Sequence, residues 1–240
     1  MSSWDFPTND PVDLQVRAAT GDVTVSAVAT QTARVTLEGD EGFITGARVE
    51  FDDGKLSVVG TGLPGLRGLG LTVTAELPEG SSCLVHTTSA DVRCSGRLGA
   101  LDVHTISGDV SAEEVSGLAR VDTASGDIDL GSAAEVRAET ASGDVSLGQA
   151  SGTVTVRTAS GDVRIAEASG LRADVKSASG DIRVAVAPGI GVYLDLSSLS
   201  GTVSSELEPA EDSGAAGLTL NCRSISGDVR VVRAAQPAAR

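Results

Sequence analysis

A short phrase, Ser-Gly-Asp-Val or Ser-Gly-Asp-Ile, recurs along this chain and limits what it can fold into. From Ser89 to Ser179 successive copies are separated by 18, 18, 17, 18 and 19 residues. A fixed short period means that each repeat is one structural unit stacked on the next, so the sequence predicts a solenoid. Complete copies begin at Ser107, Ser125, Ser142, Ser160, Ser179 and Ser226, and imperfect ones at Thr20, Ser89 and Ser200.

The residues on either side of each copy alternate between apolar and polar. Val154 and Val156 precede the copy at Ser160, for example, and Val163 and Ile165 follow it. Such alternation predicts two strands with one buried face each, joined by a turn at the Ser-Gly pair. A second turn closes each repeat. We therefore expect an all-β, single-stranded β-solenoid (β-helix) of two-strand coils, about 18 residues per coil. Its core is thin, because aromatic residues make up only 2% of the chain.

The repeats divide the chain into four parts. Residues 1–11 are expected to be an N-terminal extension, and residues 12–80 an irregular β start and cap. The cap should contain an early coil around Thr20 and a loop over 61–70. Regular coils should fill residues 81–232, with Arg230, Arg233 and Pro237 protecting the last strand edge, and residues 233–240 should form a disordered tail. Further strands are expected in the cap at residues 34–37, 47–51, 55–59 and 71–77.

Two features together resemble a known family. The segment Leu77-Pro78-Glu79-Gly80 ends an expected strand, and copies of Thr-x-Ser-Gly-Asp-Val follow it. Over residues 12–232 the chain is similar to the bacterial "putative adhesin" family of β-strand-repeat proteins, a domain of unknown function. Envelope-stress proteins of the LiaX type are relatives of that family. The resemblance implies a β-solenoid with no agreed catalytic residues and a link to envelope stress or regulatory signalling.

Composition narrows the choice of partners and compartment. The formal net charge is −15, and such a field repels nucleic-acid phosphates and anionic membrane surfaces. No apolar run is long enough for a membrane span, and no signal peptide is recognised at the start. We therefore expect a cytoplasmic protein that has neither a nucleic-acid partner nor a transmembrane segment. The three cysteines lack the spacing of a disulfide framework and are expected to be reduced core residues: Cys83, Cys94 and Cys222.

The aspartate of the phrase forms an outward-facing column. Stacked carboxylates about 5 Å apart repel by roughly 0.8 kcal/mol per pair in water, so something must offset them. Asp favours turns, and we expect arginines two residues further on to pair with the column. The column members are Asp91, Asp109, Asp127, Asp144, Asp162, Asp181 and Asp228, with Thr202 as an interruption, and the arginines are Arg93, Arg164, Arg183 and Arg230.

The middle coils lack those arginines, which leaves an acidic patch. Clusters of carboxylate oxygens suit hard cations such as Ca²⁺, so the patch is a candidate calcium site, although its spacing matches no standard calcium motif. The competing interpretation is that these residues only form turns. No other cofactor is expected. The patch consists of Asp109, Asp127, Asp129 and Asp144.

Two further columns have structural interpretations. Two residues before each Ser, on the inward side, stands Thr or Ser, which we expect to bond to the turn backbone or to a neighbouring coil. Its inward direction argues against an ice-binding face. His86 and His104 should be outward neighbours on adjacent coils, and two ligands alone make a weak zinc site.

No residue pattern here indicates catalysis. Serines are frequent because of the turns, and there is no nucleophile elbow or phosphate-binding loop. The leading hypothesis is a non-catalytic scaffold or protein-binding module that has a protein partner or associates with itself. One alternative is a carbohydrate-binding or polysaccharide-active β-helix that uses Asp127, Asp129 and Asp144 as paired carboxylates. The other is a self-assembling, filament-like structural protein.

Overall fold

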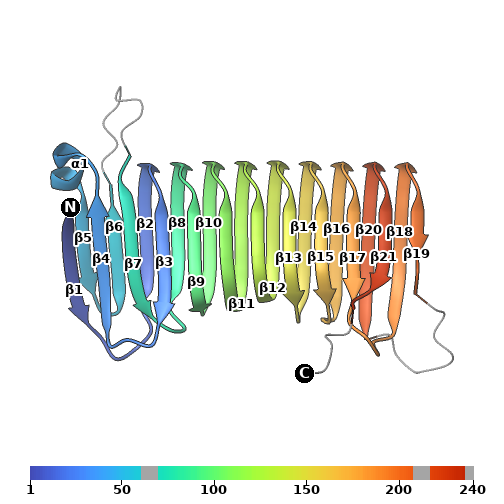
Figure 1. Ribbon diagram of the computed structural model, residues 1–240, viewed down its shortest axis with the longest axis horizontal. Coiled ribbons are helices and arrows are strands. Elements are labelled where there is room, and N and C mark those ends of the chain that lie inside the picture. The colour runs from blue at the N-terminus through green and yellow to red at the C-terminus, as the bar shows by residue number, and fades with distance from the viewer. Residues whose placement is uncertain (61–69, 208–216, 236–240) are drawn as a thin grey trace. The chain divides into compact units, whose positions relative to one another are not determined.

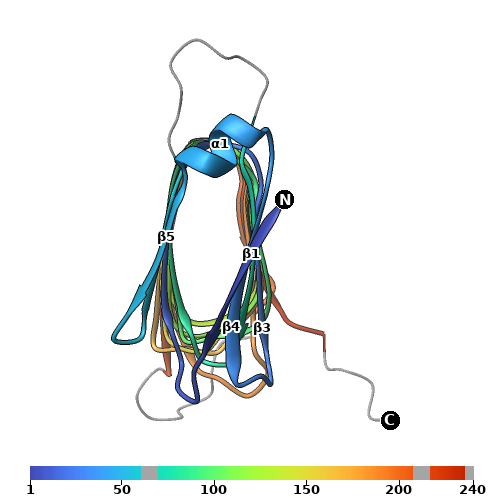
Figure 2. The ribbon, with the colours of Figure 1, turned by 90° about the vertical axis from the view of Figure 1, so that its left-hand side faces the viewer.

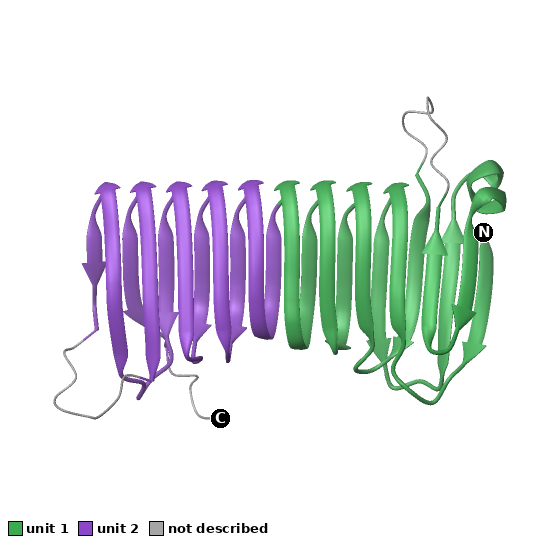
Figure 3. Cartoon of the chain, turned by 180° about the vertical axis from the view of Figure 1, so that it is seen from behind, with its two compact units in different colours: residues 1–126 green, residues 127–240 purple. Residues whose placement is uncertain are grey.

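The computed structural model describes residues 1–60, 70–207 and 217–235 and divides the chain into two compact units, residues 1–126 and 127–240 (Figures 1 and 3). Each unit is a stack of two-strand coils, which confirms the all-β solenoid predicted from the repeat. Most of the loop expected over 61–70 and of the tail expected over 233–240 lies outside the described residues. No helix in the described part is long and apolar enough to cross a membrane.

Unit 1 consists of two facing walls of strands. One wall has the strand order β5–β6–β2–β8–β10, followed by the second half of β11. The other wall has the order β1–β4–β7–β3–β9, followed by the first half of β11. The elements are β1 Ser2–Pro7, β2 Asp13–Thr20, β3 Val23–Val28, β4 Thr32–Glu38, α1 Glu41–Gly46, β5 Arg48–Asp52, β6 Lys55–Val59, β7 Thr72–Pro78, β8 Ser82–Ser89, β9 Val92–Leu98, β10 Ala100–Ser107 and β11 Val110–Ser125.

The early coil predicted around Thr20 is present and lies in register with the repeats, since Thr20 is paired with Ser89. The four further strands expected in the cap are also present, as β4 to β7. Two elements were not expected from the sequence: the helix α1, and β1, which lies within the segment interpreted as an N-terminal extension. The strand β1 pairs antiparallel with β4, so this segment is part of the sheet.

The outermost coil of unit 1 is closed by aromatic side chains. Phe6 on β1 and Phe51 on β5 stack across the gap between the walls, with ring centroids 5.1 Å apart. Phe43 on α1 is buried, and the helix lies across the top of the two walls (Figure 2). Large side chains suit this position because no further coil of the described residues covers this end of the core.

Unit 2 has the same two-wall plan, and all its described strand pairs are parallel. One wall runs from β12 through β14, β16 and β20 to β18, and the other from β12 through β13, β15, β17 and β21 to β19. The strands are β12 Ile128–Ser142, β13 Val145–Ala150, β14 Thr153–Ser160, β15 Val163–Ala168, β16 Arg172–Ser179, β17 Ile182–Val186, β18 Val192–Ser200, β19 Val203–Ser205, β20 Leu218–Ser226 and β21 Val229–Arg233.

The last coil in the sequence is not the last coil in space. The strands β20 and β21, red in Figure 1, lie between the coil of β16–β17 and the coil of β18–β19. The expectation that Arg230 and Arg233 protect the final edge is therefore wrong. Arg233 instead donates to the carbonyl oxygens of Ala187 and Ile190, at 3.1 and 2.9 Å, and the exposed edge belongs to β18 and β19.

The glycine of the phrase is required by the stacking of coils. A Cβ atom placed on Gly161 would lie 2.0 Å from the carbonyl oxygen of Gly143 in the preceding coil, and the φ angle of Gly161 is +151°. Both conditions exclude larger residues. Ala90 stands in place of this glycine in the first regular coil. Among the described residues the one non-glycine with a positive φ is Asp53, so the Ala90 turn has a different backbone conformation and no such strain.

Most of the inward hydroxyl column is buried, as its position predicted, while Thr87 and Ser198 are half-buried. The serines bond as expected, and Ser198 Oγ, for instance, donates to the Gly227 carbonyl at 2.8 Å. The threonines do not, because their hydroxyls have no hydrogen-bond partner among the described residues. The side chains concerned are those of Thr87, Thr105, Thr123, Thr140 and Thr158.

Candidate binding face

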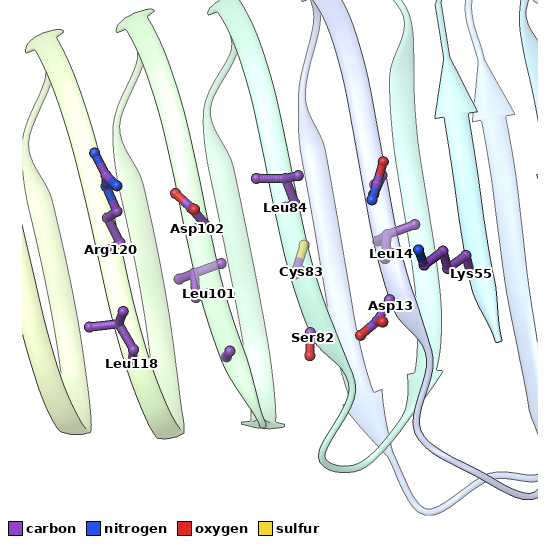
Figure 4. Close-up of a pocket in the computed structure, with 12 residues that line it drawn as sticks. Asp13, Leu14, Lys55, Ser82, Cys83, Leu84, Leu101, Asp102, Leu118 and Arg120 are labelled. Carbon is purple, nitrogen blue, oxygen red and sulfur yellow. The ribbon is translucent and has the colours of Figure 1, made fainter.

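The outer face of one wall of unit 1 carries polar, charged and apolar side chains side by side. Parallel register places Gln15 on β2, Leu84 on β8, Asp102 on β10 and Arg120 on β11 in one row across four neighbouring strands. Alternation along each strand turns these side chains outward while their neighbours in the chain enter the core. Figure 4 shows Leu84, Asp102 and Arg120 on successive strands.

A groove of about 380 Å³ follows this row and the neighbouring row. Lys55 and Asp13 lie at one end, and Arg120 lies at the other (Figure 4). Leu84, between these ends, and Leu118, on the same strand as Arg120, are half-buried and provide apolar surface. The complete lining is Asp13, Leu14, Gln15, Lys55, Ser82, Cys83, Leu84, Ala100, Leu101, Asp102, Leu118 and Arg120.

The histidine pair lies in the next outward row. His86 and His104 are paired in register on β8 and β10, and their rings stack with centroids 4.9 Å apart at an angle of 12°. This arrangement matches the prediction of outward neighbours on adjacent coils. Beside them a second hollow of about 300 Å³ is lined by Arg17, His86, Gly60 and neighbouring residues of β2 and β8.

His104 is held between two carboxylates. Its Nε2 atom lies 3.1 Å from Asp102 Oδ1, and its Nδ1 atom lies 3.1 Å from Asp122 Oδ2. These are close contacts between charged or polar groups, and Asp102 Oδ1 has no hydrogen-bond partner among the described residues. Arg120 also pairs with Asp122, at 2.9 Å. Asp102, His104, Asp122 and Arg120 thus lie together along one side of the groove, and a carboxylate oxygen faces each nitrogen of His104.

The one thiol that lines the groove is poorly suited to nucleophilic chemistry. A hydrogen bond with Cys94 and complete burial raise the pKa of Cys83 well above its usual range. A protonated, buried thiol is unreactive. All three cysteines are free and buried, as the sequence predicted. The groove is therefore suited to binding through shape and charge.

The aspartate column has a different arrangement from the one predicted. Six of the carboxylates accept a hydrogen bond from a backbone N–H one coil further along. Asp162 Oδ1, for example, accepts from the amide of Asp181 at 2.7 Å. The same bond joins Asp91 to Asp109, Asp127 to Asp144, Asp144 to Asp162, Asp181 to Asp228 and Asp228 to Thr202. We call this series the aspartate ladder. Thr202 donates to Asp228 and lies on the last described coil, so in space it ends the column rather than interrupting it.

The backbone amides, rather than the arginines, provide most of the compensation for the ladder. Arg93 pairs with Asp91 at 2.8 Å, as predicted. Arg230, in contrast, pairs with Glu206 and not with the neighbouring aspartate. Asp174, outside the ladder, shows the stronger effect of a guanidinium: a hydrogen bond from Arg172 lowers the pKa of its carboxyl.

The four residues of the candidate calcium site are all exposed. Asp109 belongs to unit 1, while Asp127, Asp129 and Asp144 belong to unit 2, and one oxygen of Asp127 and of Asp144 is already used in the ladder. Within the described residues, no three His, Cys, Asp or Glu side chains come together as a group that could hold a metal ion. Calcium binding at these residues stays a prediction, which calorimetric titration tests.

Reasoning from the sequence missed the groove. The signal was present, because every other repeat has a polar residue in the column of Leu84: Gln15, Asp102, Arg120, Arg137, Thr155, Asp174, Asp195 and Asn221. An outward leucine in an otherwise polar column marks apolar surface that the fold does not need. The volume of the groove could only come from the structure.

Comparison with known proteins identifies the family. The family model described as Toastrack DUF4097 matches residues 6–149 and 100–237. The chain belongs to this Toastrack family. No curated protein matches the sequence.

Solved structures share the Toastrack fold at low sequence identity. A "putative adhesin" from Bacteroides fragilis has a TM-score of 0.57 and 12% identity, with 97% of this chain and 96% of that chain covered. A "putative lipid binding protein" from Parabacteroides distasonis has a TM-score of 0.53 and 14% identity, with the same coverage of 97% and 96%. At such identities the likeness establishes the fold, and the family assignment agrees with the resemblance seen in the repeats.

Proposed function

We propose that this Toastrack chain is a non-catalytic binding module that holds a segment of a partner protein along the outer face of β2, β8, β10 and β11. The observation that carries the proposal is the groove, whose lining combines the apolar side chains of Leu84 and Leu118 with charged groups of both signs. Apolar anchors with a mixed polar rim are typical of protein-binding surfaces.

The chemistry of the groove favours a protein segment over a glycan or a lipid. Sugar-binding platforms use exposed aromatic rings, and the lining contains none. An acyl chain needs an enclosed apolar cavity, whereas this groove has Lys55, Asp102 and Arg120 on its rim. A peptide supplies apolar side chains and both signs of charge together. A cytoplasmic location and a role in envelope stress, which the resemblance to LiaX-type proteins supports, belong to the same proposal.

Site-specific photo-crosslinking in the native cell tests the groove directly. A photoreactive residue at Leu118 should give a covalent adduct with a protein, and the same residue at Thr153 is the control. Thr153 occupies the equivalent outward column in unit 2. Leu84→Arg should abolish the adduct from position 118, while Thr155→Arg, in the same column as Leu84, should leave it unchanged.

Several results would contradict the proposal. Equal adducts from positions 118 and 153, or none at all, would remove the groove as the binding surface. Specific retention on a glycan array, or flotation with lipid vesicles that Leu84→Arg abolishes, would assign the same face to a different ligand. A deletion strain with a normal envelope-stress response would remove the stress role and leave the binding result unaffected.

A further inference from the structure

The outermost coil of unit 2, formed by β18 and β19, exposes the end of the hydrophobic core. Leu194 and Leu196 occupy inward columns, as shown by their pairing with Leu220 and Cys222 on β20, whose side chains are fully buried. Both leucines are nevertheless only half-buried. Val203 on β19 is 42% exposed, although its partner Val229 is 0% exposed. Core positions therefore meet solvent because no described strand covers them.

This coil also lacks the devices that normally protect an open strand edge. Natural edges carry charges, prolines or bulges that prevent pairing with another chain. From Val192 to Ser205 there is neither proline nor lysine, and Asp195 is the one charged residue. Its charge is already paired with Arg223 at 3.0 Å. Tyr193 and Leu199 add exposed apolar surface at 62% and 85%.

The outermost strands of unit 1 provide the contrast. Three of the five residues in β5 are charged, β1 ends at Pro7, and the Phe6–Phe51 stack closes the core between these two strands. The chain thus protects one terminal coil with charge, proline and aromatic side chains and leaves the other apolar. Such selective protection is expected where one edge is a contact surface.

We propose that the coil of β18 and β19 is an interface for a second copy of this chain. The two copies meet about a two-fold axis, with β18 pairing antiparallel with the same strand of its partner. In this arrangement all nine residues of β18 can pair with the same strand of the second copy. The two exposed cores then become one continuous core. Because the other terminal coil is closed, association stops at a dimer.

The size of the interface is sufficient for a specific contact. Nine residues at ~3.3 Å each make an edge ~30 Å long, and two walls ~10 Å apart with their own thickness are ~20 Å wide. Each copy therefore buries roughly 600 Å², or ~1,200 Å² in total, which is at the lower end of specific interfaces. A dimer that dissociates on dilution follows from this size.

Sedimentation or light scattering of the full chain over a dilution series, from about 100 to 1 µM, tests the proposal. The mass should approach twice the chain's 24.0 kDa at the high end and fall on dilution. Val203→Lys should give a monomer throughout. Val28→Lys is the matched control, because Val28 is also 42% exposed but lies on β3 of unit 1. It should dimerise as the unchanged chain does.

Hydrogen exchange distinguishes the proposal from a folding defect. Amides of β18 should be protected at high concentration and exchange faster on dilution or in Val203→Lys, while amides of β14 stay protected in both. A monomer at every concentration would overturn the proposal, whether β18 is exposed or is covered by another part of its own chain. Open-ended growth in mass would also overturn it, because a two-fold contact closes at two copies.

Discussion

Replacing Asp162 separates the two effects that act on the aspartate ladder. Its Oδ1 accepts from the Asp181 amide at 2.7 Å, and its own amide donates to Asp144 Oδ1 at 2.8 Å. Asp162→Asn keeps an acceptor oxygen but removes the charge. Asp162→Ala removes both the acceptor and the charge. The difference in unfolding free energy between these two variants therefore measures the ladder hydrogen bond alone.

The expected magnitudes follow from this geometry. A hydrogen bond of this kind contributes about 1 kcal/mol, so Asp162→Ala should be less stable than Asp162→Asn by ~0.5–1.5 kcal/mol. Repulsion from the carboxylates on both sides, roughly 0.8 kcal/mol each in water, is relieved equally in both variants. Asp162→Asn loses the strength that the negative charge adds to this hydrogen bond but also loses the repulsion, so its stability should stay within about 1 kcal/mol of the unchanged chain. Added salt should raise the stability of the unchanged chain relative to Asp162→Asn, because it screens the repulsion between the carboxylates.

Urea unfolding followed by circular dichroism measures both differences, provided that the slope with denaturant stays the same. The control is the pair Asp129→Asn and Asp129→Ala, because Asp129 is exposed and takes no part in the ladder. Its two variants should be equally stable. If Asp162→Ala were as stable as Asp162→Asn, the ladder bond would make no contribution, and the structural explanation for the repeated aspartate would be wrong.

Three further predictions concern the core and the turns. Gly161→Ala should lower the stability of the fold by about 3 kcal/mol or more in thermal melts, because the added Cβ would meet the Gly143 carbonyl. The control Gly54→Ala should lower it by only ~1 kcal/mol, because Gly54 has a φ of +75° but open space around it. Thr123→Val should be as stable or up to ~1 kcal/mol more stable in urea, because the hydroxyl it removes is buried without a partner; a clear loss would reveal an important bond. Burial raises the pKa of Cys222 to about 12. The unfolded thiol ionises at lower pH, so unfolding free energy should fall between about pH 9 and 12 by up to ~1.4 kcal/mol per unit, and Cys222→Ala should reduce that slope.

Much of the fold was predictable because each coil repeats the same local sequence pattern. Alternation around Ser160 specifies two half-buried strands, and the Ser-Gly pair specifies a turn, without reference to distant residues. The stacked histidines followed from the same register. The lack of hydrogen-bond partners for the threonines could not be predicted from the register, because a hydroxyl's partner depends on small differences in the distance between coils. The helix α1 was missed because six residues over 41–46 show no helical period.

The candidate site was only partly accessible in the same way. Leu84 stands out as an apolar residue in a polar column. Its role in a binding groove, however, depends on Lys55, Asp13 and Arg120, which lie on other strands. Those neighbours are set by which strands pair. Reasoning from the sequence instead selected the acidic patch around Asp127, because it considered charge without the backbone donors that the structure supplies.

The sequence by itself determined the repeating coil, its buried columns and the outward position of the aspartate. It could not determine the order of coils in space. Every repeat offers nearly the same edge to its neighbours, so local pattern does not distinguish pairing of β18 with β16 from pairing with β20. The tertiary structure decided that β20 lies inside and β18 outside. With that choice it also decided what the repeated phrase does: Gly permits close stacking, and Asp bonds the next coil's amide until the ladder ends at Thr202.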